Sequence, residues 1–138
     1  MPPTFLLGQA LDAVFIDRTD PAKGRAGQDE LVERLRAGLS VFVAPEGTRS
    51  PTPVLGPFRT GAFHVARTAR VPMVPIVLRN SYDLNPGTAK IIRPGVVDVA
   101  VLDPIPTGGW TRETAREDVA AVRKLFADTL DNWPEEAR

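Results

Sequence analysis

The sequence contains no cysteine, so disulfide bonds and thiolate metal sites are excluded. Its one histidine, His64, cannot build a histidine-rich metal site alone. Basic and acidic residues balance at 17 each, so no overall charge attracts nucleic acid. No apolar run approaches the roughly 18 residues that cross a bilayer. These absences predict no metal and no nucleic-acid partner, and they leave only peripheral contact with a membrane.

The composition that remains is that of an ordinary globular protein. Of 138 residues, 43% are hydrophobic and 25% are charged, which predicts a single domain over 1–138. Fourteen prolines predict many defined turns and short elements. The pattern contains no internal repeat and no linker that would divide the chain.

Short apolar runs alternate with amphipathic segments along the chain. Strands are predicted at 13–16, 40–44, 73–78 and 96–102, the third interrupted by Pro75 and the last more exposed. Helices are predicted after Gly27–Glu30 with Gly38 as the C-terminal cap, after Thr60, and over about 111–132 as a long amphipathic helix. This alternation indicates an α/β fold with a largely parallel sheet flanked by helices.

The sequence opens almost directly on a predicted buried strand, with no preceding helix to cover the sheet. We therefore hypothesise that the N-terminal part of the fold is missing and that the chain is truncated or misannotated. An uncovered sheet face would expose apolar surface, so marginal stability is expected.

A group of arginines suggests an anion site. Residues 44–70 hold four arginines against one acid, a local net charge of +3. Arg49 follows a predicted strand through the turn at Gly47, and Arg59 precedes the predicted helix start at Thr60. Strand ends and helix N-termini are common phosphate sites. The alternative is that these arginines are solvated or paired with acids elsewhere.

Three sequence blocks resemble the lysophospholipid (1-acylglycerol-3-phosphate) acyltransferase superfamily. Ala44–Ser50 (APEGTRS), followed by Phe58–Phe63, is similar to the third conserved block of that family. Val71–Ile76 resembles the fourth block, and Ala13–Arg18 resembles the second, with Asp12 where glycine is usual. The blocks stand in the family's order over roughly residues 10–105.

The resemblance implies acyl transfer from an acyl thioester, either acyl-CoA or acyl-carrier protein, to a lysophospholipid such as 1-acyl-glycerol 3-phosphate. The product would be a phosphatidic acid, made at the cytoplasmic side of the membrane by a peripheral protein without a cofactor. Carried over from the family, the acceptor phosphate site would comprise Arg18, Glu46, Gly47, Thr48, Arg49 and Arg59, with Pro75 shaping the pocket. Glu46 would bond an acceptor hydroxyl or hold the arginines. Oligomeric state is not indicated.

The sequence departs from this family at its catalytic block, a histidine followed five residues later by an aspartate. His64 lies after the third block and is followed at that distance by Ala69, so we expect a packing or surface role for it. The prediction is therefore that no catalytic residue is present and that this chain alone is inactive. The alternative is a non-catalytic phosphoanion-binding or interaction domain.

The aromatic residues near the C-terminus are predicted to pack or cap. Trp110 and Trp133 bracket the predicted C-terminal helix, which is too acidic to bind a lipid surface well. Tyr82 is predicted to pack beside a turn.

Overall fold

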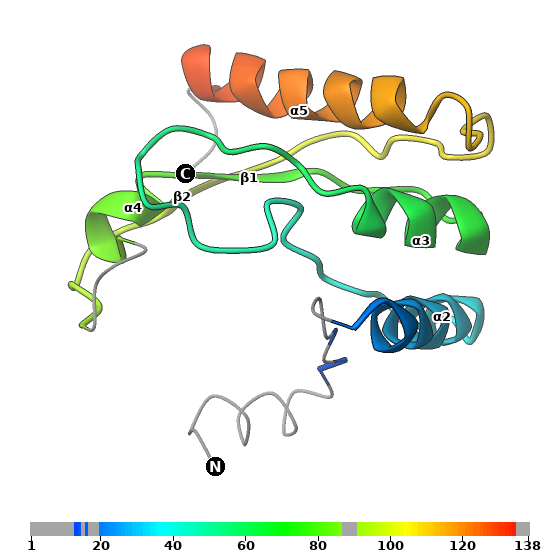
Figure 1. Cartoon of the computed structure of the whole chain (residues 1–138). Coiled ribbons are helices and arrows are strands. Elements are labelled where there is room, and N and C mark those ends of the chain that lie inside the picture. The colour runs from blue at the N-terminus through cyan, green and yellow to red at the C-terminus, as the bar shows by residue number, and fades with distance from the viewer. Residues whose placement is uncertain (1–12, 15, 17–19, 87–90, 135–138) are drawn as a thin grey trace. The chain divides into compact units, whose positions relative to one another are not determined.

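The structure, a computed structural model, describes residues 13, 14, 16, 20–86 and 91–134. It divides into two compact units, Met1–Phe42 and Val43–Arg138 (Figure 1). The described part of the first unit holds helix α2, and the second unit holds α3, β1, α4, β2 and α5 in chain order. The single domain expected over 1–138 stays a prediction.

Helix α2 spans Pro21–Arg36, and it begins earlier than the start predicted after Gly27–Glu30. Asp20 is its N-cap, and the Asp20 carboxylate accepts hydrogen bonds from the backbone N–H groups of Ala22 and Lys23. Pro21 stands at the first helical position, where its missing N–H costs nothing. The pair Asp20-Pro21 therefore starts the helix, because the cap satisfies N–H groups that have no partner inside the helix.

The end of α2 confirms the predicted role of Gly38. This glycine adopts a left-handed φ of 87°, and its N–H donates to the Leu35 carbonyl at 3.0 Å. The next N–H, from Leu39, donates to Arg34 at 3.1 Å. These two bonds satisfy carbonyls of the last turn in the pattern typical of glycine-terminated helices.

The described sheet has two antiparallel strands, β1 (Ile76–Arg79) and β2 (Asp98–Val101). An isolated antiparallel bridge between Met73 and Ile105 extends the pairing beyond a break at Pro75. The largely parallel sheet predicted from the sequence is not seen among the described residues. A parallel pair needs a crossover connection, usually helical, whereas the described residues between these strands hold just the four-residue helix α4 (Ser81–Leu84).

Two predicted strands are not found among the described residues. Within that part of the chain, the run 40–44 pairs with no strand, and Phe42 is 76% exposed, so the expectation of a buried strand there is wrong. An apolar run forms a strand only when another strand pairs with its backbone. Among the described residues, β1 and β2 pair with each other. In 13–16, residues 13, 14 and 16 are likewise not in a strand, and residue 15 lies outside the described residues.

The core of the second unit lies between α3 (Gly61–Ala69) and α5 (Ala115–Asp131), with α5 running along one face of the strands (Figure 1). Phe58 contacts Phe126 edge-to-face at 5.1 Å between centroids. The ring centroids of Phe63 and Trp110 lie 5.7 Å apart, which confirms the packing role predicted for Trp110. The cluster comprises Leu55, Phe58, Ala62, Phe63, Met73, Ile105, Trp110, Val119, Val122 and Phe126. The apolar stripe of the predicted C-terminal helix therefore faces inward.

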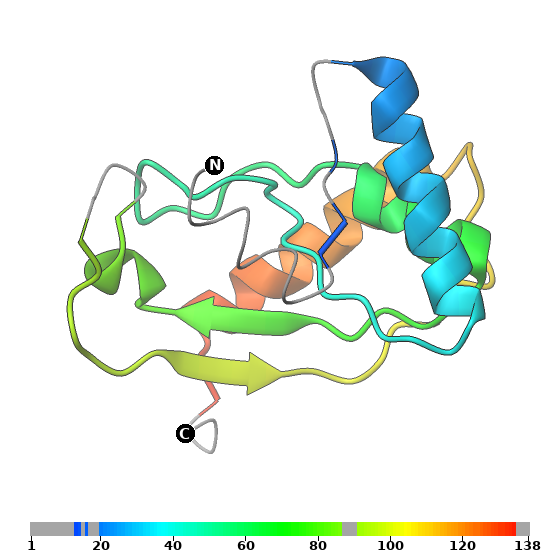
Figure 2. The same cartoon turned by 90° about the horizontal axis from the view of Figure 1, so that it is seen from below.

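The two faces of the sheet differ sharply in burial. Val77 and Ala100, paired in register, are 1% and 3% exposed on the face toward α5. The opposite face, which we call the aliphatic face, consists of Ile76, Leu78, Val99 and Val101, all exposed. Figure 2 shows the strands from this side, with no helix of the second unit in front of them. This agrees with the expectation of an exposed apolar sheet surface.

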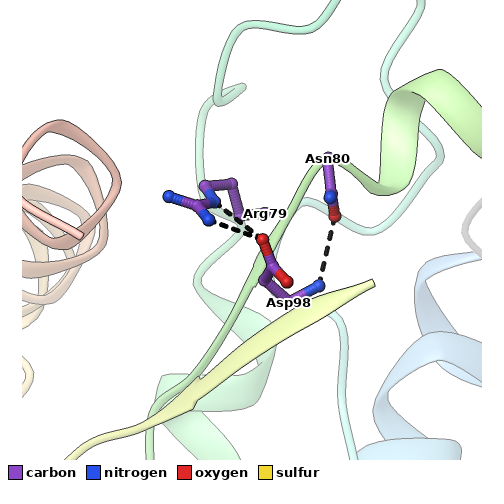
Figure 3. Close-up of polar contacts among 3 residues, drawn as sticks. All are labelled: Arg79, Asn80 and Asp98. Atoms are coloured by element: carbon purple, nitrogen blue, oxygen red, sulfur yellow. Dashed lines mark hydrogen bonds and ion pairs between the residues drawn. The ribbon is translucent and has the colours of Figure 1, made fainter. Parts of the chain in front are cut away.

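A polar cluster closes one end of the strand pair (Figure 3). Arg79 donates from Nε and Nη2 to one carboxylate oxygen of Asp98 at 3.1 and 2.6 Å, and Asn80 Oδ1 accepts the Asp98 N–H. The Arg79 guanidinium also lies 4.5 Å from the ring centroid of half-buried Trp133. Trp133 thus packs against the end of the strand pair, as its predicted packing role requires.

Candidate functional site

The arginine-bearing segment forms a closed loop, which we call loop 45–59. The Arg59 N–H donates to the Pro45 carbonyl at 2.8 Å, and this bond joins the two ends of the loop. Gly47 has a left-handed φ of 73°, and its N–H donates to the Ala44 carbonyl at 3.0 Å. Gly47 therefore forms the turn for which the sequence predicted a glycine.

The side chain of Glu46 forms a hydrogen bond across loop 45–59. Its Oε2 accepts a hydrogen bond from the backbone N–H of Gly56 at 2.8 Å, in a half-buried position. A Cβ atom on Gly56 would lie 2.6 Å from the same oxygen, so any other residue here would force the Glu46 carboxylate to shift. The two roles predicted for Glu46, bonding an acceptor hydroxyl or holding the arginines, stay predictions.

Helix α5 holds the same stretch of the loop from the other side. Arg123 donates from Nε to the Gly56 carbonyl at 2.9 Å and from Nη2 to the Leu55 carbonyl at 2.8 Å. Buried Phe58, two residues on, anchors this end of the loop in the core. The second half of loop 45–59 is thus fixed by both polar and apolar contacts.

The first half of the loop is held by α4 and the residue that follows it. Arg49 Nη1 donates to Asn85 Oδ1 at 3.0 Å, and Tyr82 Oη donates to the Pro51 carbonyl at 3.0 Å. The Arg49 side chain remains exposed. Tyr82 therefore does more than the turn-side packing predicted for it, since it ties the loop to α4.

Arg59 is exposed and stands just before helix α3. Thr60 occupies the predicted N-cap position, but its side chain makes no capping bond, and the first turn contains no acidic residue. The partial positive charge of this helix end is therefore not offset by either kind of residue. Such a helix start, next to an exposed arginine, favours an anion.

The other predicted site residues differ in where they lie and how exposed they are. Arg18 lies outside the described residues. Thr48 is exposed beside Arg49. Pro75 is among the fully buried side chains, and its carbonyl accepts the Leu102 N–H at 3.0 Å, so it contributes to the interior of the second unit. The common anion pocket for the three predicted arginines stays a prediction, as does the pocket-shaping role of Pro75.

His64 is exposed on α3, which confirms its predicted surface character. Its Nδ1 lies 3.0 Å from Nη2 of Arg67. A guanidinium can only donate, so Nδ1 is the acceptor in this contact and a neutral ring carries its proton on Nε2. A general base needs the opposite arrangement, in which an acid orients the ring through the protonated nitrogen.

The contacts that three residues make with loop 45–59 have no signal in the sequence. Asn85 and Tyr82 lie 36 and 31 residues from their loop partners, and Arg123 lies 67 and 68 residues from its own. Neither spacing nor composition indicates contacts at these separations. Only the fold brings α4 and α5 to the loop.

Comparison with known proteins shows the family. The family model described as Acyltransferase matches residues 1–79. The chain is 32% identical over 124 residues to a 1-acyl-sn-glycerol-3-phosphate acyltransferase of Haemophilus influenzae, covering 89% of this chain and 51% of that protein. It is 39% identical over 98 residues to the human beta form of an enzyme with this name, covering 70% and 35%. The chain belongs to the acyltransferase family.

A solved structure supports the same assignment. The crystal structure of the 1-acyl-sn-glycerophosphate (LPA) acyltransferase PlsC from Thermotoga maritima superposes with a TM-score of 0.74 at 26% identity. The match covers 98% of this chain and 54% of that one. The predicted α/β acyltransferase-like fold is therefore confirmed. The chain spans about a third to about half of the length of these three relatives.

Proposed function

We propose that this chain forms the acceptor-binding part of an enzyme that transfers an acyl group from acyl-CoA or acyl-carrier protein to a lysophospholipid such as 1-acyl-glycerol 3-phosphate. The main support is loop 45–59, which presents Arg49 and Arg59 to solvent from a backbone fixed at its base, at α4 and at α5. Family membership and the names of the relatives support the same substrate class.

In this reaction the acceptor hydroxyl oxygen attacks the thioester carbonyl carbon. A C–O bond forms, the C–S bond breaks, and the hydroxyl proton ends on the departing thiol. The part of this chain is to hold the acceptor phosphate through Arg49 and Arg59, together with Arg18. Each charge-assisted bond to phosphate contributes about 1.5–3 kcal/mol. Fixing the phosphate places the hydroxyl for attack.

We assign no residue of these 138 as the base that accepts the hydroxyl proton. The sequence holds no histidine followed five residues later by an aspartate, and His64 contacts a cation. We propose that a segment outside these residues supplies the base. The same observations favour a second candidate for the chain by itself, a non-catalytic phosphoanion-binding domain.

The substrate class also suggests a location. Lysophospholipids are amphiphiles that reside in membranes, so we propose peripheral contact with the cytoplasmic side of the membrane. Among the described residues, none of the helices has the length and apolar character needed to cross a bilayer. Flotation of the protein with vesicles that contain lysophosphatidate tests the proposal, and sedimentation of the protein away from such vesicles would contradict it.

The deciding experiment compares Arg49→Ala with the parent sequence in a protein that includes any upstream coding sequence. Removing one anchoring bond should raise the KM for 1-acyl-glycerol 3-phosphate about tenfold or more, with the KM for the thioester unchanged. An unchanged acceptor KM would refute the assignment. For the 138 residues alone we expect binding of glycerol 3-phosphate without turnover, and acyl transfer by the purified chain would contradict the missing base.

A further inference from the structure

Gly56 lies between two opposite charges. Its N–H donates to the Glu46 carboxylate at 2.8 Å, and its carbonyl accepts from Arg123 Nε at 2.9 Å. Both contacts are part-buried, so solvent screens them less than surface pairs. A single residue of the loop thus connects Glu46 to a cation on helix α5.

The contact from Arg123 is a fork. Its Nε and Nη2 bind the neighbouring carbonyls of Gly56 and Leu55 at 2.9 and 2.8 Å. Two bonds from a planar guanidinium fix the orientation of the peptide group between those carbonyls, which a single point charge cannot do. The Gly56 N–H is consequently held in position to bind Glu46.

The position of the Glu46 carboxylate matters for an anion site. Glu46 is the one acid in residues 44–70, and Arg49 lies three positions after it. A carboxylate free to move would pair with an exposed arginine or repel a phosphate. Bound to Gly56, it is held within the loop and fixes the backbone that leads to Arg49 and Arg59.

We propose that Arg123 is a positioning residue for the acceptor phosphate site. It acts through Gly56 on Glu46, and so sets the affinity of loop 45–59 for a phosphate monoester. This inference rests on the proposed function, since it takes loop 45–59 as the phosphate site.

The test is a titration of the isotope-labelled chain with glycerol 3-phosphate, followed by backbone amide NMR, with inorganic phosphate in a parallel arm. Arg123→Gln should weaken binding of glycerol 3-phosphate about tenfold, and Arg123→Lys should give a smaller loss because the ammonium keeps the positive charge and can still donate to one of the two carbonyls. Lys124→Gln is the matched control, since it removes the same charge from the next residue, which pairs with Asp128 on the exposed side of α5. It should leave affinity unchanged. The inorganic phosphate arm shows whether the loop recognises the phosphate group alone.

A double-mutant cycle separates positioning from general support of the fold. In a Glu46→Ala background, Arg123→Gln should cost little further affinity, because the group that it positions is gone. A residue that only supports the fold would reduce affinity by the same factor in both backgrounds. The thermal midpoint of each variant is measured alongside, and should fall with Arg123→Gln in either background.

The outcomes are distinct. Absence of glycerol 3-phosphate binding by the unmutated chain would overturn the proposed function and this inference together. Binding by the unmutated chain that Arg123→Gln leaves unchanged would overturn this inference alone. Equal losses of affinity from Arg123→Gln in the parent and in the Glu46→Ala background would also overturn this inference alone. If Arg123→Gln does not fold, the cycle is run with Arg123→Lys, with the same criteria.

Discussion

Arg49 donates a hydrogen bond to the side-chain oxygen of Asn85 at 3.0 Å, across 36 residues of sequence. The amide is a neutral acceptor, so the bond orients the guanidinium without cancelling its charge. The remaining donors of Arg49 can still bind an anion. An exposed arginine that is already oriented loses less conformational entropy when it binds a ligand than one that moves freely.

The first prediction concerns Asn85. Asn85→Asp should weaken glycerol 3-phosphate binding about tenfold, because a carboxylate would form a charge-assisted pair with Arg49 and compete with phosphate. Asn85→Ala should have a smaller effect, since it frees Arg49 without adding negative charge. Calorimetric titration of both variants decides the matter. Equal affinities for Asn85→Asp and the parent chain would contradict the proposed role of Arg49.

The second prediction concerns the aliphatic face. Val101, the most exposed of its members at 67%, should tolerate Val101→Lys within about 0.5 kcal/mol of unfolding free energy. The substitution should also lower the fluorescence of an apolar-surface dye. Val77→Thr, at a 1% exposed site on the opposite face, should destabilise by about 1–3 kcal/mol through a buried hydroxyl. Unchanged dye fluorescence in Val101→Lys would show that the dye binds elsewhere.

The third prediction concerns the aromatic cluster. Phe63 is 3% exposed and packs against Trp110, so Phe63→Ala should cost about 3–5 kcal/mol, the lost transfer energy plus a cavity. Phe42→Ala, at a 76% exposed position, serves as the control and should change stability by less than about 0.5 kcal/mol. Denaturant unfolding measures both. Similar losses in the two variants would mean that Phe63 is not a core residue.

The fourth prediction separates two glycines. Gly38 has a φ of 87°, so Gly38→Ala should destabilise α2 by about 1–2 kcal/mol, although a Cβ there meets no atom within 4 Å. Gly108 is equally open but has no left-handed φ, so Gly108→Ala should be neutral or stabilising by up to about 1 kcal/mol. Helix content and unfolding free energy are the measurements. A neutral Gly38→Ala would argue against the left-handed end of α2.

Local chemistry was predictable from the sequence. Gly38 at the end of α2 and Gly47 in the loop turn were both predicted, because a left-handed φ favours glycine whatever lies around it. The sequence also contains the signal for the earlier start of α2, which is Asp20 followed by Pro21. The helix was instead predicted to begin after Gly27–Glu30, so this start signal was missed.

Non-local pairing was not predictable. The alternation over 96–102 indicates two faces, but the face that is buried carries Ala100 and not the valines. Which face is covered depends on α5, more than a dozen residues further along. The same reason applies to the site, where the motif residues were found in the sequence and their partners Asn85 and Arg123 were not.

The attachment of loop 45–59 to its surroundings has a consequence for heating. Tyr82 ties the loop to α4, Arg123 ties it to α5, and Phe58 inserts into the aromatic cluster. A segment with so many anchors has no melting transition of its own. Warming should therefore abolish phosphate recognition only where the helices themselves come apart, in one step and not as an early loss.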